Sequence, residues 1–535
     1  MADVNTKTGC YLTRRQFVNK GSLFIGGLSV LPSLSFARSA LAEAGGPWLD
    51  FNKLYRMKLR VKFVIGCLIH DTAHEGPCRI GNLSQLTKEV DLKNHEANFE
   101  MRKKQIQGRT FPSEVELLKT VDFKMLVKEK DCEFKFPNSE FTKLEKEIEQ
   151  TDLLVTLDGF NGQIGIKLAE QYKKPVASIA YSNPERPQDW GAWLVDMTAG
   201  LKHKGLEGYL AYDWKDLDSI LSLLWVKKAF ANTSMLVMTD RFGQSPHGMG
   251  SVFYHFDALN KMYGMRHHHI PNQAAADRME AIMADKAACM RAEKITESLV
   301  SNAQAVHMKK ENIKKSVYFY QAVKSLMDEN NCNCFGAACR EICPLEMGAK
   351  YKFTPCLAHS LLRDSGHPSV CQMDFNALLA MMALTYISKK SAYMGNPEFY
   401  KDNNTVHIWH GAGDVKMKGF DSPTMPYEIR NFTTGGWGVS LKYDFSKDKG
   451  EIVTLGRFNP GFDKLLITKG SITKGFGIDG IACALGVEVQ VSDVMEVFNS
   501  QKEFGSHLVM VYGDYVEDVK RLGKMMSFDV ISVGC

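Results

Sequence analysis

Apolar runs alternate with amphipathic stretches through the first two thirds of the chain, a pattern typical of strands alternating with helices. The predicted strands cover residues 59–66, 153–157, 175–181 and 234–239, and the predicted helices cover 165–172 and 216–230. A strand, a helix and a second strand in this order form a βαβ unit, which favours mostly parallel sheets covered by helices. A domain boundary near residue 230 fits the gap between two such sets.

From about residue 405 the pattern changes to short strands separated by glycine turns. The strands expected there cover 406–409, 437–443, 451–455 and 465–468, and the chain closes with a strand over 508–512, a helix over 516–526 and a strand over 530–533. The fold class expected is therefore α/β: two Rossmann-like α/β domains followed by a mainly β C-terminal domain. The predicted domains span 47–229, 230–398 and 399–535.

The composition supports a folded protein of several domains. A chain of 535 residues exceeds the size of one core, and about 150 residues per domain gives about three domains. Hydrophobic residues make up 44% and charged residues 24%, without low-complexity runs, internal repeats or sustained heptads. Disorder and coiled coil are thereby disfavoured.

The first 42 residues have the features of a twin-arginine signal peptide. Arg14 and Arg15 precede a mild apolar run over 23–36, and Ala40-Leu41-Ala42 supplies small residues for a signal peptidase. The alternative is a membrane anchor, but the run is shorter than the ~20 residues that span a bilayer. We expect a bacterial protein that is periplasmic or otherwise extracytoplasmic, with the twin-arginine export machinery as a partner and no membrane span after processing.

The charge gives no reason to expect nucleic acid as a partner. The formal net charge is +5, and removal of residues 1–42 leaves +1. A nearly neutral mature chain lacks the basic balance typical of nucleic-acid or acidic-membrane binding.

Six of the 13 cysteines gather in one stretch: Cys332, Cys334, Cys339, Cys343, Cys356 and Cys371. The first four form the pattern C-x-C-x4-C-x3-C, which matches no standard metal motif. Three interpretations stay open: structural disulfides in an oxidising compartment, buried thiols, and a metal or iron–sulfur site.

Three further segments have features of binding sites. Gly159 to Gly165 follows a strand and opens a helix, as a phosphate-binding turn does, but its spacing differs from the dinucleotide fingerprint. Residues 241–250 are glycine-rich, as expected of a loop over a site. The run His267-His268-His269 is expected in a polar surface loop, because adjacent histidines cannot all face one ion.

Several blocks in the second half carry a resemblance to a known superfamily. They are Thr354-Pro355-Cys356, Gly366, Cys371-Gln372-Met373-Asp374, His407-Ile408-Trp409-His410-Gly411, Thr454-Leu455-Gly456-Arg457-Phe458, and the strand from His507 to Gly513-Asp514. In this order they resemble the L-fucose/L-arabinose isomerase superfamily over residues 230 to 535.

The resemblance implies interconversion of an aldose and a ketose through an enediol, with Mn²⁺ or another divalent metal as cofactor. By position the family's metal-binding glutamate falls on Gln372, its aspartate on Asn396 and its histidine on Asp514. An amide keeps the shape of a carboxylate but not its charge, so the metal site looks altered.

The candidate catalytic residues are therefore Gln372, Asn396 and Asp374, although Asp374 is equally suited to capping a helix. Gln372, Asn396 and Asp514 are the candidate metal ligands, and His410, His507 and Trp409 the candidate sugar contacts. A shifted alignment would bring Glu398 or Asp402 into the role of Asn396, and Glu346 is a further anionic candidate.

Three classes of function follow. The first is an exported sugar isomerase with a modified site, acting on a small sugar or sugar derivative. The second is a sugar-binding relative without catalysis, and the third is a different exported enzyme that uses the cysteine-rich stretch or a cofactor. The resemblance also implies a homo-oligomer, a trimer or a hexamer.

Overall fold

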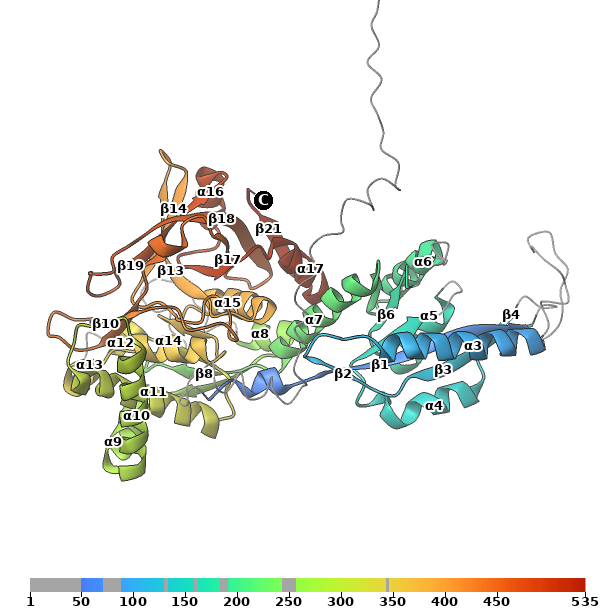
Figure 1. Cartoon of the computed structure of the whole chain (residues 1–535), viewed down its shortest axis with the longest axis horizontal. Coiled ribbons are helices and arrows are strands. Elements are labelled where there is room, and N and C mark those ends of the chain that lie inside the picture. The colour runs from blue at the N-terminus through green and yellow to red at the C-terminus, as the bar shows by residue number, and fades with distance from the viewer. Residues whose placement is uncertain are drawn as a thin grey trace, which may run out of the picture.

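A computed structural model describes residues 50–70, 88–128, 133–157, 162–182, 191–242, 256–342 and 346–534 (Figure 1). The leader sequence, the turn at 159–161, most of the 241–250 stretch and Cys343 lie outside these residues.

The first domain is built on a largely parallel sheet in the order β4-β3-β1-β5-β6-β7, with β2 beside β1. Its strands are β1 (Leu59–His70), β2 (Val115–Leu117), β3 (Val121–Lys128), β4 (Glu133–Lys135), β5 (Leu153–Leu157), β6 (Val176–Ile179) and β7 (Gly208–Ala211). Only β4 among them is antiparallel to its neighbour. The helices are η1 (Lys53–Arg56), α3 (Lys88–Gln107), α4 (Asn138–Ile148), α5 (Gln163–Tyr172) and α6 (Gly191–His203). The predicted βαβ unit is confirmed as β5, α5 and β6.

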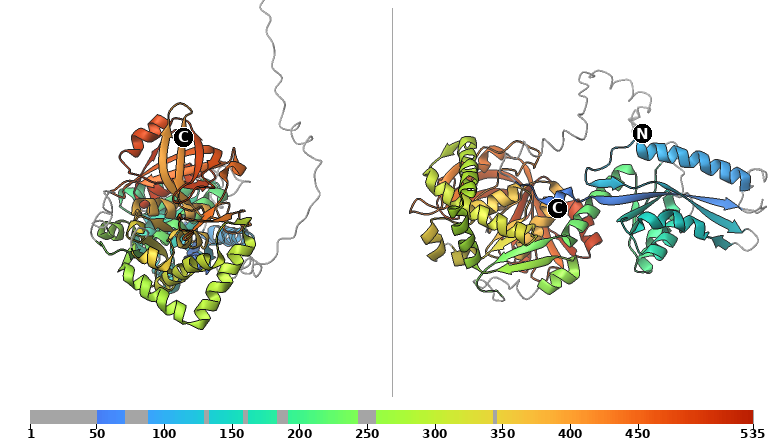
Figure 2. Two further views of the ribbon diagram at one scale, coloured as in Figure 1. Left: turned by 90° about the vertical axis from the view of Figure 1, so that its left-hand side faces the viewer. Right: turned by 90° about the horizontal axis from the view of Figure 1, so that it is seen from below.

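The second α/β domain contains a parallel sheet in the order β12-β11-β8-β9. Its strands are β8 (Ser234–Met238), β9 (Arg266–Ile270), β11 (Cys334–Ala337) and β12 (Ser369–Cys371). The helices are α8 (Phe256–Tyr263), α9 (Asn272–Ala284), α10 (Lys286–Asn302), α11 (Lys310–Glu329), α12 (Cys339–Ile342), α13 (Glu346–Tyr351) and α14 (Cys356–Asp364). The helix α7 (Trp214–Ala231) links it to the first domain, which lies apart from the rest of the molecule in Figure 2.

The prediction of a polar loop for the histidine run is wrong. His267, His268 and His269 belong to β9, which pairs with β8 in parallel at the edge of the sheet. Because an edge strand with its side chains turned to solvent needs no apolar alternation, the sequence pattern gave no strand signal there. His269 Nε2 lies 2.8 Å from the carbonyl oxygen of Thr239.

The C-terminal region is an antiparallel barrel. Its sheet runs β17-β20-β13-β14-β19-β18, and pairing of β17 with β18 closes it, while β21 adds in parallel to β18. The strands are β13 (Tyr393–Tyr400), β14 (Thr405–His410), β17 (Ile452–Phe458), β18 (Lys464–Phe476), β19 (Leu485–Val491), β20 (Leu508–Tyr512) and β21 (Asp529–Ser532). Helices α16 (Val494–Gln501) and α17 (Val516–Met526) and the short helix η6 (Phe445–Asp448) accompany them. A separate sheet in the order β10-β15-β16 is formed by β10 (Ala305–Val306), β15 (Glu428–Asn431) and β16 (Val439–Lys442).

One apolar helix joins the second domain to the barrel. In α15 (Phe375–Ser388) every residue from Phe375 to Tyr386 is buried. It packs on β17 and β20 of the barrel on one side and on β12 and α7 on the other. A helix buried all round has no polar face to expose, which explains its run of Ala, Leu and Met. Its N-terminus is therefore fixed where the second domain meets the barrel.

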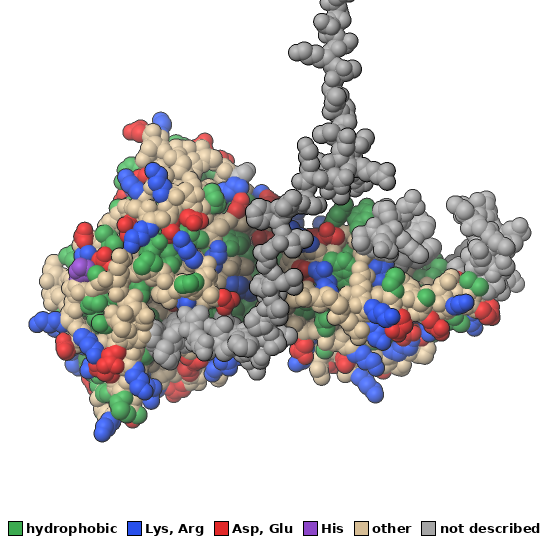
Figure 3. All heavy atoms as spheres, in the orientation of Figure 1, with side chains coloured by type: hydrophobic (Ala, Val, Ile, Leu, Met, Phe, Trp, Pro, Cys, Tyr) green, Lys and Arg blue, Asp and Glu red, His purple; other side chains and the backbone are tan. Residues whose placement is uncertain are grey.

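The described surface carries both signs of charge. On the face shown in Figure 3, Lys and Arg side chains are interspersed with Asp and Glu without a large area of one sign. Among the helices that the structure describes, none is long and apolar enough to cross a membrane.

Candidate functional site

The candidate site lies where the carboxyl ends of β11 and β12 meet the barrel. After β12 the chain turns sharply, with positive φ angles at Gln372 (57°) and Met373 (58°), and then enters α15. Such left-handed conformations cost free energy in residues other than glycine, and strain of this kind is concentrated at functional sites. Ligands of open α/β sheets also bind outside the carboxyl ends of the strands.

Asp374 is the centre of a buried polar network. Its Oδ1 caps α15 by accepting from the backbone N–H of Ala377 at 3.0 Å. Its Oδ2 accepts from Arg457 Nη1 and from His507 Nδ1, each at 2.7 Å. Burial alone would raise the pKa of Asp374, but the Arg457 charge and the His507 hydrogen bond hold it well below its ordinary value. The carboxylate is therefore ionised at neutral pH, and it combines both roles weighed from the sequence, helix cap and site residue.

Two histidines face each other beside this carboxylate. Because an ionised carboxylate only accepts hydrogen bonds, His507 must carry a proton on Nδ1, which leaves Nε2 as the acceptor nitrogen in the neutral ring. The His507 and His410 ring centres are 5.5 Å apart, and Nε2 of each ring is buried without a hydrogen-bond partner. Burial, followed by the neighbouring His507 and Arg363, lowers the pKa of His410 well below its ordinary value. A neutral imidazole at His410 is expected at physiological pH.

Gln372, Asn396 and Trp409, the other candidate residues of this region, are half-buried. Asn396 on β13 pairs in register with Trp409 on β14, and its side-chain amide donates to the Trp409 carbonyl at 3.4 Å. The preceding residue, Gly395, pairs with Leu508, next to His507. Asn396, Trp409, His410 and His507 thus occupy neighbouring positions at the middle of β13, where β14 ends and β20 begins. Because successive side chains of a strand face opposite sides, Trp409 shares the face of Asn396, while His410 lies on the other face of the sheet. Trp409 Nε1 is also buried without a partner.

The structure does not bring Asp514 to this group. Asp514 follows the far end of β20, seven residues from His507, which is roughly 20 Å along a strand. Its Oδ2 pairs with Lys469 Nζ at 2.7 Å, its side chain is 45% exposed, and its Oδ1 accepts from Val516 N at the start of α17. At this distance Asp514 cannot bind the same ion as Gln372 and Asn396, and the prediction that groups the three residues as ligands of one metal is wrong in this respect.

The alternative anionic candidates differ in position. Glu398 on β13 is exposed and accepts from Tyr400 OH at 2.8 Å, and Asp402 is exposed in the turn after β13. Glu346 begins α13, and its side chain lies outside the described residues.

The residues described do not fit the Mn²⁺ ion that the resemblance implies. Manganese prefers anionic oxygen ligands, whereas Gln372 and Asn396 offer neutral amides and Asp514 is distant. At this site the buried atoms that could bind a metal and that lack a hydrogen-bond partner are imidazole nitrogens. Imidazole ligands suit zinc, copper, iron and nickel. We therefore derive no step through Mn²⁺ at this site.

A thiol and imidazole cluster lies directly behind Gln372. Cys339, Cys371 and His359 are buried, and their ligand atoms all lie within 4.8 Å of one another. Cys371 Sγ is 2.8 Å from Cys339 Sγ, and His359 Nε2 is 3.5 Å from Cys339 Sγ. The hydrogen bond from Cys371, opposed by burial and supported by His359, lowers the pKa of Cys339 well below its ordinary value. The backbone N–H of Gln372 also donates to Cys339.

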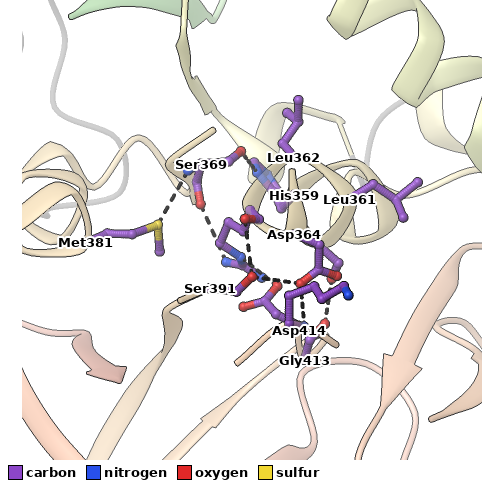
Figure 4. Close-up of polar contacts among 12 residues, drawn as sticks. His359, Leu361, Leu362, Asp364, Ser369, Met381, Ser391, Gly413 and Asp414 are labelled. Carbon is purple, nitrogen blue, oxygen red and sulfur yellow. Dashed lines mark hydrogen bonds and ion pairs between the residues drawn. The ribbon is translucent and has the colours of Figure 1, made fainter. Parts of the chain in front are cut away.

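A buried scaffold holds His359 in place (Figure 4). Ser369 Oγ lies 2.7 Å from His359 Nδ1. On the same helix α14, Asp364 accepts from Ser391 Oγ and from two backbone N–H groups of the loop after β14, while Arg363 Nε donates to Asp414 at 2.8 Å. These bonds attach α14 to the barrel, so the position of His359 depends on both domains.

Several of these residues gave no signal as site residues in the sequence. His359 is a single histidine in an apolar helix, and its role follows only from the fold. Arg457 belongs to a quoted motif, but its partner Asp374 is 83 positions away. Glu341, at the same edge of the second sheet, binds Thr239, the Asp240 N–H and Asn272. Its spacing in the sequence resembles no motif.

A larger hollow than that at the thiol cluster lies elsewhere. A cavity of about 1040 Å³ lies near the C-terminal end of α15, lined in part by Tyr55, Trp225, Tyr386 and Lys389. Lys389 Nζ lies 3.4 Å from the centre of the Trp225 ring, and burial lowers the pKa of Lys389 to about 8. Because α15 is about 20 Å long, this cavity is separate from the site at Asp374.

Comparison with known proteins relates this chain to sugar isomerases. No protein-family model matches the chain. The similar proteins are sulfoquinovose isomerases: that of Alkalicoccus urumqiensis is 22% identical over 225 residues, covering 41% of this chain and 49% of the relative. Those of Priestia aryabhattai and Priestia megaterium are 24% identical over 236 residues, covering 41% of this chain and 48% of each relative. The chain thus spans about half the length of the curated relatives it matches.

Proposed function

We propose that this protein binds a sugar or sugar derivative and interconverts its aldose and ketose forms at the site between β12 and the barrel. The observation that carries the proposal is His507, held by ionised Asp374 through Nδ1 and left with an unpartnered Nε2 beside His410. The similarity to sulfoquinovose isomerases supports the same class of reaction.

Interconversion of an aldose and a ketose requires transfer of a proton between adjacent carbon atoms. His507 Nε2 removes the proton from the carbon next to the carbonyl, and the imidazolium formed is stabilised by Asp374. The same nitrogen returns the proton to the neighbouring carbon of the enediol, which completes the isomerisation. His410 donates to or accepts from the oxygen atoms that exchange carbonyl and hydroxyl character.

The half-buried side chains complete the polar surroundings. Gln372 and Asn396 each offer an amide donor and a carbonyl acceptor, which suits neutral sugar hydroxyls. Trp409 adds an aromatic ring of the kind that packs on the apolar face of a sugar, with its N–H as a donor. We further propose that the protein works outside the cytoplasm after twin-arginine export and as a homo-oligomer.

The test is exchange of solvent deuterium into the sugar, followed by NMR. The mature chain is incubated with sulfoquinovose and with a panel of pentoses and 6-deoxyhexoses in D₂O. We expect deuterium at C2 of the aldose or C1 of the ketose for at least one sugar. His507→Asn should lower the exchange rate by about 100-fold or more, since general base catalysis contributes 10²–10⁴-fold.

His407→Asn is the matched control. His407 lies on β14 three residues before His410, but its Nε2 faces Glu488 at 2.7 Å. Its replacement should leave exchange unchanged. Absence of exchange with every sugar by folded protein, or equal rates for His507→Asn and the wild type, would overturn the proposal. Stoichiometric binding without exchange would instead indicate a sugar-binding protein.

A further inference from the structure

We propose that Cys339, Cys371, His359 and Cys356 form a binding site for one thiophilic divalent cation of the zinc type. This site goes beyond the isomerase activity proposed above and does not depend on it. The ion proposed is a soft or borderline cation, whereas the ion that the resemblance implies, Mn²⁺, is a hard one.

The geometry of the three central ligands is close to that of a tetrahedral site. Around zinc, with Zn–S of about 2.3 Å and Zn–N of about 2.0 Å, ligand atoms lie roughly 3.5–3.8 Å apart. The 3.5 Å between His359 Nε2 and Cys339 Sγ matches this spacing. The two sulfur atoms, at 2.8 Å, must separate by about 1 Å, which a small rotation of either side chain provides.

Cys356 lies outside the group of three ligand atoms within 4.8 Å of one another, but it lines the same small cavity and is the candidate fourth ligand. A small cavity of about 10 Å³ is lined by Cys356, His359, Cys371 and His410, with Arg363 and Ala412. That volume suits about one water-sized particle. Cys356 begins α14 and faces the cavity together with Cys371 and His359. Three sulfurs and one imidazole nitrogen are a usual ligand set of structural zinc.

The surroundings orient the imidazole and balance the charge. With a proton on Nδ1 directed to Ser369 Oγ at 2.7 Å, His359 presents the lone pair of Nε2 to the sulfurs. Metal-bound histidines regularly make such a second hydrogen bond. Lys442 on β16 is fully buried, and its Nζ lacks a hydrogen-bond partner. Burial lowers the pKa of Lys442 to about 8, while the neighbouring Cys356 and Cys483 oppose this, so negative charge on the thiols favours the ammonium form beside them.

Binding of the ion releases protons from its ligands. Each ligand thiol that is protonated releases one proton, and no electron is transferred. The competing state is a disulfide between Cys339 and Cys371, which requires loss of two electrons and two protons to an oxidant and shortening of the sulfur distance to about 2.05 Å. In the structure both are free thiols.

The test uses the full mature chain, reduced and freed of metal, with Zn²⁺ alone or Co²⁺ alone as the probe. We expect one Zn²⁺ per chain to survive gel filtration, measured by elemental analysis. Co²⁺ should give intense thiolate-to-metal charge-transfer absorption together with the visible bands of a tetrahedral ion. This spectrum needs no variant, so it tests the site even where a substitution disturbs folding.

Variants then locate the ion. Cys371→Ser and Cys339→Ser should weaken Zn²⁺ binding, measured by competition with a chromogenic chelator, by about 100-fold or more. Cys67→Ser, at a half-buried thiol on β1 of the first domain, is the matched control and should bind as the wild type does. His507→Asn should keep the ion while losing deuterium exchange, which separates this site from the isomerase proposal.

Three results would overturn the site. They are a Co²⁺ spectrum without thiolate charge transfer, equal Zn²⁺ affinity in the wild type and both serine variants, and a Cys339–Cys371 disulfide in the isolated protein with no Zn²⁺ uptake after reduction.

Discussion

Lys389 shows how a single residue encodes a dependence of stability on pH. It ends α15 in a left-handed conformation, with φ of 56°, and its ammonium group lies on the Trp225 ring. Burial disfavours the charged form and lowers the pKa of Lys389 from 10.5 to about 8, while the charge on Glu114 partly opposes this. The folded protein therefore binds this proton less strongly than the unfolded chain.

The direction in which the free energy of unfolding changes with pH follows from this difference in proton affinity. Between about pH 8 and about pH 10.5 the unfolded chain holds the proton and the folded chain does not, so Lys389 makes the free energy of unfolding rise with pH. The rise is at most about 3 kcal/mol for a shift of this size. Lys389→Met should remove it, as measured by urea denaturation across this pH range.

The exposed residue Lys520 supplies the comparison for that measurement, because its ammonium group pairs only with Glu517 on the surface of α17. The difference between the wild type and Lys520→Met should stay constant with pH. Identical pH profiles for the wild type and Lys389→Met would show that the charge on Lys389 is not desolvated.

At the scale of elements, β13 explains how the histidines of the site are brought together. The strand lies between β14 and β20, and a close approach at Gly395 sets their spacing. A Cβ atom at Gly395 would lie 2.7 Å from Ile408 Cγ2 and 2.8 Å from the backbone nitrogen of Trp409. Only glycine permits this distance, which is tighter than real Cβ contacts.

Gly395→Ala is expected to push β13 and β14 apart and to lower the free energy of unfolding by about 1–3 kcal/mol, the usual cost of overpacking. Thermal unfolding followed by circular dichroism measures this loss. Gly200→Ala in α6 is the matched control, since its Cβ would meet only Ile166 Cδ1 at 3.6 Å. That change should be neutral or stabilising by up to about 1 kcal/mol. Equal melting temperatures for Gly395→Ala and the wild type would contradict the close approach.

Sequence patterns predicted the elements with clear periodicity and missed those without it. The strands 153–157 and 508–512 and the helix 516–526 are confirmed with the same limits as β5, β20 and α17. The strand β13 was not predicted, because Gly395 and Pro397 interrupt its pattern. Proline lacks a backbone N–H and therefore cannot donate to a neighbouring strand. Pro397 is tolerated because the pairing of β13 with β20 ends at Gly395, so no hydrogen bond to β20 is lost there.

For the candidate site, motifs located Asp374, His410 and His507 but not their geometry. Position by position matching placed Asp514 with Gln372, whereas the antiparallel course of β20 carries it to the opposite end of the strand. The role of His359 depends on the packing of α14 against the barrel, a contact between distant parts of the chain that no local pattern encodes.

At the scale of the whole molecule, the described part of the chain is two bodies joined through α7 and through the segment before β1, where Asn52 bonds to the carbonyl groups of Ser365 and Gly366. Trp225 on this helix donates to the Met57 carbonyl of the first domain, and Asp216 pairs with Arg521 of α17 at 2.8 Å. The candidate site lies wholly in the second domain and barrel.

Export of the whole chain remains a prediction from the leader sequence. Replacing Arg14 and Arg15 together by lysine should retain the precursor in the cytoplasm, because a lysine ammonium cannot reproduce the planar, multiple hydrogen bonding of guanidinium. Cell fractionation with immunoblotting measures the fraction exported. Lys7→Arg outside the arginine pair should be exported as the wild type is. Equal export of the double variant would show that another route is used.

The histidine run in β9 has a consequence for how the folded protein meets its neighbours. The barrel closes on itself, but in the second sheet β9 has a partner on one side only among the described residues. Arg266, His267 and His268 are exposed along it. An apolar strand there would invite a strand from another molecule, whereas an edge that carries an arginine and bulky polar rings discourages such pairing. This stretch, which has no part in the proposed catalysis, would thus keep copies of the folded protein from joining edge to edge.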